Sequence, residues 1–284
     1  MKLEDKRINN LTNLKFGIVQ GRLLKSPTGK LQWFPETNWE DEFIIAASLG
    51  IDNIELIADR EFNSKNPIWS EKGIQKIRKL SIENNVKVNT ICNDHIINYD
   101  LHENIDLLNQ NLDLIKIGVK LNCNKFILPF FEKSELNISN YTKYIEYIKI
   151  IAETCEKSNI VLCLETILNA KDLLYILRKI NIDNIKVVFD TGNRIAFGHN
   201  IYEDLMLLGN KIEHIHIKDK NTKNENVLLG TGLVNFLYLF KALKKINYIK
   251  SYTFETTRGL NPKKTCEFNM NFINYFCEET VNEF

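Results

Sequence analysis

Eight short apolar segments that are typical of β-strands alternate with eight segments of helical periodicity along this chain of 284 residues. The segments at 125–131 and 186–190 illustrate the strand type, whereas the helical segments repeat their apolar residues every three or four positions. A strict alternation of this kind predicts a parallel sheet with right-handed crossovers. At this length we expect α/β architecture with a single (β/α)8 TIM barrel, and a doubly wound open sheet is the alternative.

The composition narrows the class of protein. Hydrophobic residues make up 44% of the chain, and the net charge of +1 without a basic cluster argues against a nucleic-acid partner. The six cysteines are scattered without a C-x-x-C pair, which favours reduced thiols over disulfides or a zinc knuckle. The N-terminal segment is charged and no apolar run reaches bilayer-spanning length, so we expect a cytoplasmic protein without a membrane partner.

The expected domain spans residues 1–284, with a polar leader over 1–13 and the barrel over about 14–277. No G-x-G-x-x-G motif follows the first strand segment, which argues against a dinucleotide-binding sheet. Helix starts are predicted at the capping-box pair Thr37 and Glu40, and at the stretch G-T-G-L-V-N-F. The last helix is expected to dock through an apolar stripe of Phe268, Phe272 and Phe276.

The segment I-E-H-I-H-I-K-D alternates apolar and polar residues with the period of a strand. His214, His216 and Lys218 therefore face one side, and Ile215 and Ile217 face the other. Strands of α/β proteins are usually covered on both faces and are apolar throughout. The two imidazoles consequently need polar partners on the inner face of the barrel.

Three other strand segments end in acids and are able to supply those partners. They are V-L-C-L-E ending at Glu165, K-V-V-F-D ending at Asp190, and Y-T-F-E ending at Glu255. With His216, these acids occupy four successive strands at spacings near one βα unit, roughly 30 residues, and barrel enzymes place catalytic groups at such strand ends. The neighbours expected to point outward, under the helices, are Leu164, Phe189, Ile217 and Phe254.

Three carboxylates and one imidazole in a barrel mouth would repel one another strongly without a divalent cation among them. An oxygen-rich set with a single nitrogen favours Mn²⁺, Mg²⁺ or Co²⁺ over structural zinc, although Zn²⁺ is not excluded. The alternative is that each acid is only a polar residue at the end of a strand. That alternative explains a single acid more easily than a set on four successive strands.

These motifs together resemble the xylose-isomerase-like TIM-barrel superfamily, and in particular its sugar-phosphate isomerase/epimerase group. The matching motifs are G-I-V-Q-G-R-L, L-E-T, F-D-T-G-N, H-I-H-I-K-D, G-T-G-L-V-N-F and F-E-T-T, spread over nearly the whole chain. The set is specific for the superfamily and poorly specific for the substrate. The resemblance implies that Glu165, Asp190, His216 and Glu255 hold the metal, and that the two glutamates also act as acid and base.

The implied activity is a metal-dependent isomerase or epimerase of a sugar or sugar derivative. A divalent ion on the carbonyl and neighbouring hydroxyl of a ketose acidifies the carbon-bound proton and stabilises an enediolate. One glutamate removes the proton and the other returns one. Return on the opposite face gives epimerisation, and return to the adjacent carbon gives isomerisation.

Further side chains near the strand ends are candidates for contacts with the substrate. Gln20 and Arg22 share the inward face of the first strand, and Arg258 suits a carboxylate or phosphate group. His214 is expected to be a hydrogen-bonded core or orienting residue more than a ligand, and Glu55 a satisfied buried acid. The full set of predicted substrate contacts is His95, Asn193, His214, Lys218, Arg258, Gln20 and Arg22.

Three other functions share this fold. A dehydratase of an inosose-like polyol would use the same enolate chemistry. An apurinic-site endonuclease needs additional histidines, but Asn193 stands where such an enzyme carries one, and no D-x-H pair follows the seventh strand. A non-catalytic barrel would not require the intact set of four. Barrels of this group commonly form dimers or tetramers, so a homo-oligomer is an expectation from the resemblance.

Overall fold

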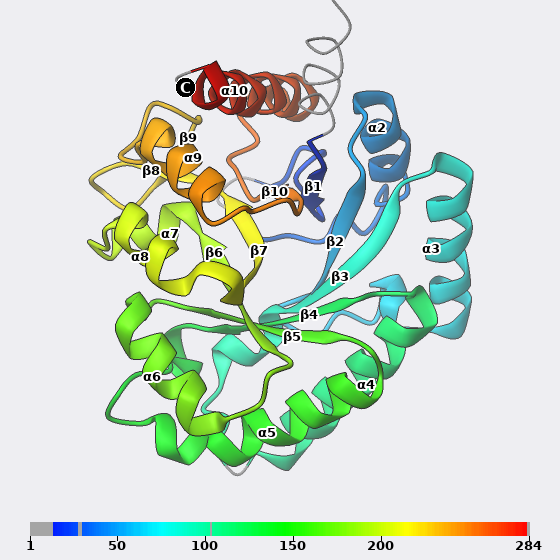
Figure 1. The fold of residues 1–284 in the computed structure, drawn as a ribbon. Helices are drawn as coiled ribbons and strands as arrows, with labels where there is room; N and C mark the ends of the chain where they lie inside the picture. The colour runs from blue at the N-terminus through cyan, green and yellow to red at the C-terminus, as the bar shows by residue number, and fades with distance from the viewer. Residues whose placement is uncertain (1–13, 28–29, 103, 283–284) are drawn as a thin grey trace, which may run out of the picture.

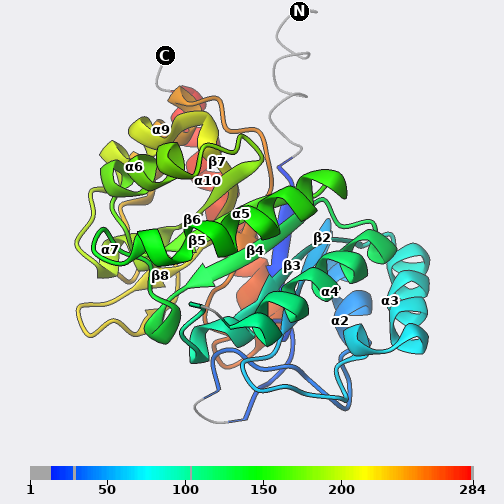
Figure 2. The same ribbon diagram turned by 90° about the horizontal axis from the view of Figure 1, so that it is seen from below.

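The computed structural model describes residues 14–27, 30–102 and 104–282, so the predicted leader lies outside the described residues. Eight parallel strands close into a barrel in the order β1-β10-β7-β6-β5-β4-β3-β2, and helices surround it (Figures 1 and 2). The predicted (β/α)8 barrel is therefore confirmed. The barrel strands are β1 Phe16–Val19, β2 Asn53–Ala58, β3 Lys87–Asn93, β4 Lys125–Phe130, β5 Val161–Thr166, β6 Ile185–Asp190, β7 Ile212–Ile217 and β10 Tyr252–Phe254.

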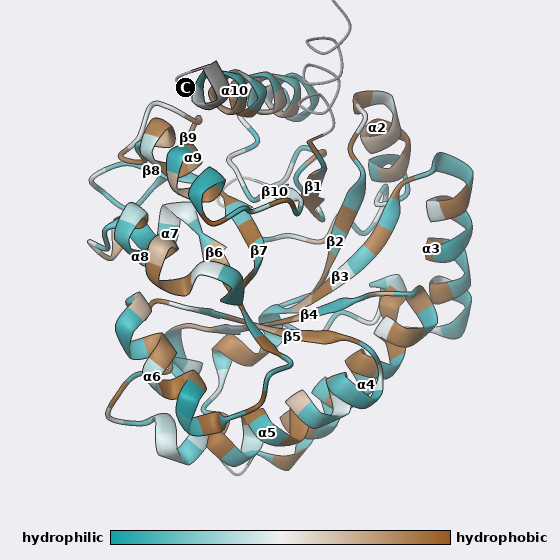
Figure 3. Cartoon of the chain, in the orientation of Figure 1, coloured by the Kyte–Doolittle hydropathy of each residue, from teal (hydrophilic) through white to brown (hydrophobic). Residues whose placement is uncertain are grey.

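The helices that follow the strands form the outer layer. In Figure 3 the helices α4 and α5 alternate hydrophobic and hydrophilic residues, as expected of helices with one apolar face. None of the described helices is both long and apolar enough to cross a membrane. The α-helices are α2 Asp41–Leu49, α3 Glu71–Asn84, α4 Ile105–Leu121, α5 Tyr141–Lys157, α6 Ala170–Ile180, α7 Thr191–Ala196, α8 Ile201–Leu208, α9 Phe236–Lys245 and α10 Pro262–Asn282.

The strand residues separate into two apolar clusters, one on each side of the barrel wall. The outer cluster packs under the helices and includes all four residues predicted to point outward. The inner cluster fills the barrel and includes Cys163 and Val188, each two residues before a predicted site acid. Because side chains alternate along a strand, Glu165 and Asp190 must then also point inward. The complete inner cluster is Val19, Ile57, Cys92, Ile127, Cys163 and Val188.

The helix starts differ from two of the predictions. Glu40 is the N-cap of α2, but no side chain makes a capping hydrogen bond there, so the predicted capping box does not form. The G-T-G stretch forms a loop, and α9 begins only at Phe236, where the side chain of Asn235 accepts from the N–H of Tyr238. A periodicity argument could not detect this loop, because its cause is a distant carboxylate.

That carboxylate belongs to Asp219, in a two-stranded hairpin, β8 Asp219–Lys220 and β9 Asn226–Val227, that the sequence analysis did not predict. It accepts hydrogen bonds from the backbone N–H groups of Gly230, Gly232 and Val234 at 2.9–3.0 Å. These bonds satisfy backbone donors that a helix would otherwise use. Asp219 thus holds the loop that follows β7 against the barrel mouth.

The final helix, α10, lies between α9 and α2 and closes the ring (Figure 1). Phe272 packs edge-on against Phe236 of α9 with ring centroids 4.9 Å apart, and Phe276 stacks on Phe240 at 6.4 Å. Phe268 is 45% exposed, so only two of the three predicted aromatic residues are docked.

Candidate active site

The four predicted ligands converge at the carboxyl ends of their strands. Glu165 is the fifth residue of β5, Asp190 ends β6, His216 is the fifth residue of β7, and Glu255 directly follows β10. All four side chains are buried, and one ligand atom from each lies within 4.8 Å of the others. The structure therefore brings together side chains from four successive barrel strands, as the spacing in the sequence led us to expect.

His216 is the centre of this cluster. Its Nδ1 lies 3.3 Å from Glu255 Oε2, 3.7 Å from Glu165 Oε1 and 3.9 Å from Asp190 Oδ2. That nitrogen is buried and has no hydrogen-bond partner among the described residues. A buried polar atom of this kind is costly unless something binds it.

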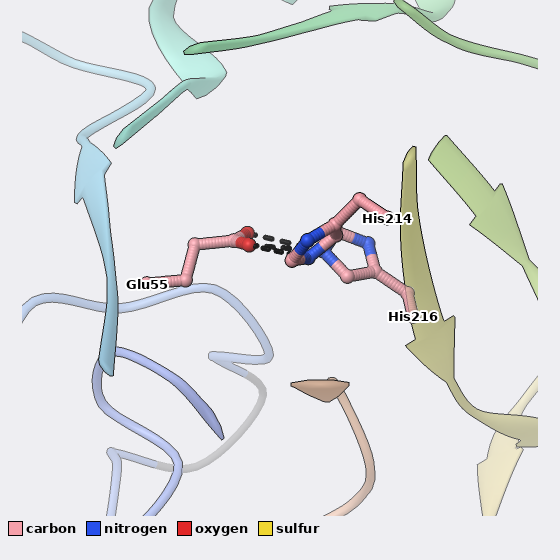
Figure 4. A group of neighbouring side chains, drawn as sticks. All are labelled: Glu55, His214 and His216. Carbon is pink, nitrogen blue, oxygen red and sulfur yellow. Dashed lines mark hydrogen bonds and ion pairs between the residues drawn. The ribbon is translucent and has the colours of Figure 1, made fainter. Parts of the chain in front are cut away.

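Glu55 determines which nitrogen of the His216 imidazole faces the acid cluster. Its carboxylate reaches from β2 across the barrel to both histidines of β7 (Figure 4), 3.1 Å from His216 Nε2 and 2.9 Å from His214 Nε2. Burial by itself raises the pKa of Glu55, but the charge of His216 and the contacts with both imidazoles lower it to about 2. An ionised carboxylate only accepts, so Nε2 of His216 carries a proton and Nδ1 faces the three acids.

His214 and Lys125 continue this network toward the other end of the barrel. Lys125 Nζ lies 3.0 Å from His214 Nδ1, and both residues are buried. Burial and the neighbouring Lys125 lower the pKa of His214 to about 3, so its ring is neutral and Nδ1 accepts from the ammonium. His214 is not one of the described residues that line the cavity above the acids. Its position therefore suits the predicted orienting role better than a substrate contact.

Lys218 lies within the acid cluster. Its ammonium is 2.8 Å from Asp190 Oδ2 and 2.7 Å from Glu255 Oε2, and the side chain is buried. Burial would lower the pKa of Lys218, but Asp190 and Glu255 raise it above its ordinary value. The side chain is thus a cation that partly neutralises the acids, in addition to lining the cavity.

Neighbouring donors orient the two glutamates. Arg22 Nη2 lies 3.3 Å from Glu255 Oε1 while Nη1 donates to the carbonyl of Thr256. Asn193 Nδ2 donates to Glu165 Oε1 at 3.3 Å. Burial raises the pKa of Glu165, whereas Glu255, although equally buried, has its pKa lowered by Lys218 and His216. The two glutamates therefore have different electrostatic environments.

The side chains of the other three predicted substrate contacts have backbone partners. Gln20 accepts from the N–H of Ile57 at 3.3 Å, and His95 Nδ1 lies 2.7 Å from the carbonyl of Arg60. Arg258 donates to the backbone carbonyls of Gly21, Lys30 and Leu31. None of the three is among the described residues that line the cavity, so their roles as substrate contacts stay predictions that this placement does not favour.

A cavity of about 410 Å³ opens above the cluster and is lined by Glu165, His216, Lys218 and Glu255. Its walls also contain residues that the sequence analysis did not select. Asp94 could have been found, because it is two residues after the inward-facing Cys92, whereas His95 has the opposite parity. Gln32, Arg60, Phe131, Glu132, Glu135 and Phe197 lie between the barrel strands and the main helices, in segments that carry no periodic signal. The principal unpredicted lining residues are Gln32, Arg60, Asp94, Phe131, Glu132, Glu135 and Phe197.

The cluster fits a divalent metal ion. Three carboxylates and one imidazole offer ligand atoms within 4.8 Å of one another, and His216 Nδ1 faces the acids without a hydrogen-bond partner among the described residues. Hard and borderline divalent ions favour such oxygen-rich sets. Glu165, Asp190, His216 and Glu255 would be the residues that hold it.

The chain is similar in sequence to a curated protein of Haemophilus influenzae, named "Putative L-ribulose-5-phosphate 3-epimerase SgbU". The two are 22% identical over 277 residues, which cover 89% of this chain and 92% of that protein. The alignment thus extends over nearly the whole of both chains.

Solved structures share the fold at low sequence identity. D-psicose 3-epimerase from Clostridium cellulolyticum H10 has a TM-score of 0.75 and 17% identity, with 93% of this chain and 99% of that chain covered. The IOLI protein with a bound zinc atom has a TM-score of 0.71 and 17% identity, with 95% and 99% covered. The sequence model of the xylose isomerase-like TIM barrel matches residues 43–275. The chain therefore belongs to the xylose isomerase-like TIM barrel family.

Proposed function

We propose that this protein is a metal-dependent epimerase or isomerase of a sugar or sugar derivative. The observation that carries the proposal is the cluster of three acids and His216 beneath a cavity of about 410 Å³. Cavities of roughly 300–1,000 Å³ are usual for small-molecule ligands. The similarity to proteins named as sugar 3-epimerases supports epimerisation of a ketose as the leading form of the reaction.

The residues of the cluster have two roles in this proposal: they hold the metal ion, and two of them transfer protons. A divalent ion in the cluster would supply Lewis-acid polarisation of a substrate carbonyl. Glu165 on β5 and Glu255 after β10 stand on either side of β6 and β7, so they approach a substrate from different directions. One removes the proton next to the carbonyl and the other returns a proton to the opposite face.

Two features of the site assist this proton transfer. Arg22 and Asn193 each contact one oxygen of a glutamate, which fixes the direction of its carboxylate. Burial of both glutamates keeps bulk water from competing as a proton donor. We infer that these contacts position Glu255 and Glu165 for transfer, because misplacement by even about 1 Å is costly in such reactions.

The test is exchange of substrate carbon-bound hydrogen with D₂O, read by NMR, with Mn²⁺-loaded protein and a panel of ketoses, ketose phosphates and inososes. We expect exchange in at least one ketose, and its loss in Glu165→Gln and in Glu255→Gln. Glu153→Gln, an exposed glutamate on α5, is the matched control and should keep full exchange. Full exchange in both site variants would overturn the acid and base assignment, and reaction of an inosose alone, with loss of water, would favour the dehydratase.

A further inference from the structure

Asp94 is a buried acid at the cavity that the proposed chemistry does not use. It directly follows β3, as the first residue of the 3-10 helix Asp94–Asn98, and is 5% exposed. The side chain lines the cavity above the acid cluster and also an adjoining hollow of about 380 Å³ that shares Gln32 and Arg60. Asp94 therefore stands in the wall between the reaction centre and the outer part of the mouth.

The two carboxylate oxygens of Asp94 are not equivalent. The thiol of Cys92 donates to Oδ1 at 3.3 Å, which directs that oxygen toward the barrel interior. Oδ2 is buried and has no hydrogen-bond partner among the described residues. An unsatisfied buried acceptor costs roughly 1–3 kcal/mol, and more when it is charged. Oδ2 is therefore an acceptor that a donor group entering the cavity could satisfy.

Two arginines of the mouth, Arg60 and Arg22, each contact another acid. Arg60 contacts Glu132 at 2.6 Å, and Arg22 donates to Gln32 and contacts Glu255. Asp94 is also not part of the set of four ligand atoms that lie within 4.8 Å of one another. Burial, and then Glu255, raise the pKa of Asp94 to about 7.

We propose that Asp94 is a substrate-binding residue whose Oδ2 accepts a hydrogen bond from a hydroxyl group of the sugar. This inference rests on the proposed function and adds to it a polar subsite outside the metal cluster. A hydroxyl fits because it donates to Oδ2 without adding negative charge near Glu132 and Glu135, which line the same cavity. A phosphate at this position would instead meet three acids.

The experiment measures steady-state epimerisation and binding of D-psicose, D-tagatose and D-ribulose 5-phosphate by the Mn²⁺-loaded protein. Asp94→Ala should raise KM about tenfold to a hundredfold, as expected for loss of a hydrogen bond to a charged group, with a smaller effect on kcat. Mn²⁺ affinity, measured by calorimetry, should be unchanged. Asp94→Asn keeps the shape of the side chain, so its KM should rise less than that of Asp94→Ala. This second variant separates loss of the hydrogen bond from a fold defect in the alanine variant.

Asp113→Ala, an exposed acid on α4, is the matched control and should behave as wild type. Monodeoxy analogues of the reacting ketose complete the test. One analogue should bind to wild type and to Asp94→Ala with the same affinity, because the hydroxyl that Asp94 contacts is already missing.

The two levels of the proposal fail in different ways. If wild type turns over a ketose and Asp94→Ala has the same KM, or if every deoxy analogue is weakened equally by the substitution, the role of Asp94 is wrong and the proposed function stands. If wild type binds Mn²⁺ but neither binds nor converts any member of the full panel of ketoses, ketose phosphates and inososes, both are overturned. A loss of Mn²⁺ affinity in Asp94→Asn would contradict a subsite separate from the metal cluster.

Discussion

The carboxylate of Glu55 lies 3.1 Å from Nε2 of His216, although the two residues stand 161 positions apart in the chain. The contact crosses the interior of the barrel from β2 to β7 (Figure 4). It fixes the proton on Nε2 and leaves Nδ1 for the acid cluster. The sequence analysis predicted only a satisfied buried acid at Glu55, whereas the structure shows that its carboxylate orients a predicted metal ligand.

We expect Glu55→Gln to weaken metal binding, because an uncharged amide cannot hold both histidines. Loss of the hydrogen-bond partner of a metal-binding histidine typically lowers metal affinity about tenfold to a hundredfold. Competition titration of Mn²⁺ against a chelating dye measures the change. Glu153→Gln serves again as the control. An unchanged affinity in a folded Glu55→Gln protein would show that His216 is held by other contacts.

Lys218 is expected to oppose metal binding, because its ammonium already lies against Asp190 and Glu255. Lys218→Met should therefore raise Mn²⁺ affinity at least about tenfold, given the few kcal/mol of repulsion between cations at such distances. The same variant should lower the melting temperature of the metal-free protein, since the acids lose their counter-charge. Calorimetry with and without Mn²⁺ distinguishes the two effects, and a metal affinity that falls would contradict the expectation.

Glu42 is predicted to make stability depend on pH. Its buried carboxylate accepts from the N–H groups of Gly21 and Leu23, yet burial raises its pKa from 4.5 to about 7. The folded protein thus holds this proton more tightly than the unfolded chain does. The contribution to stability is full below about pH 4.5 and is lost as the pH rises through 7.

Glu42→Gln cannot ionise, so the stability of wild type relative to this variant should fall by up to about 3 kcal/mol between pH 4.5 and 7 and then stay level. Urea unfolding of both proteins at pH 5 and pH 8 measures the difference. A gap that grows in favour of wild type as the pH rises would reverse the sign of the argument.

Gly232 is expected to be intolerant of any side chain. A Cβ at this position would lie 2.3 Å from Asp219 Oδ1, which also holds the N–H of Val234. Gly232→Ala should therefore displace Asp219 and the adjacent Lys218, reducing both stability and turnover. Gly50→Ala, where a Cβ meets nothing within 4 Å but the backbone φ is 76°, should lose only about 1–2 kcal/mol of stability and keep its turnover. Equal losses of turnover in the two variants would contradict the role of the loop.

Much of the site followed from local patterns in the chain. Strand periodicity assigns His216 and Glu165 to the inner face, and the structure has both side chains there. The same parity rule, applied to the third strand, selects Asp94 in preference to His95. The prediction of His95 came from its position at a strand end, without regard to the face on which it lies.

Other features depended on contacts between distant segments. The G-T-G stretch has the composition of a helix start, but the carboxylate of Asp219 holds it as a loop. Arg258 has the chemistry of an anion-binding residue, yet its Nε and Nη1 donate to three backbone carbonyls of the first loop. In both cases the partner is identified only after the barrel has closed.

The sequence by itself determined the barrel and the inward direction of the four predicted ligand residues, because alternation along a strand is set by covalent geometry over a few residues. Tertiary structure alone decided that Glu55 meets His216 and that Lys218 lies among the acids. It also decided that one oxygen of Asp94 has no hydrogen-bond partner within the described part of the chain. The reason is physical: hydrogen bonds and ion pairs act over about 3 Å, and only closure of the barrel brings these side chains from separate strands within that distance.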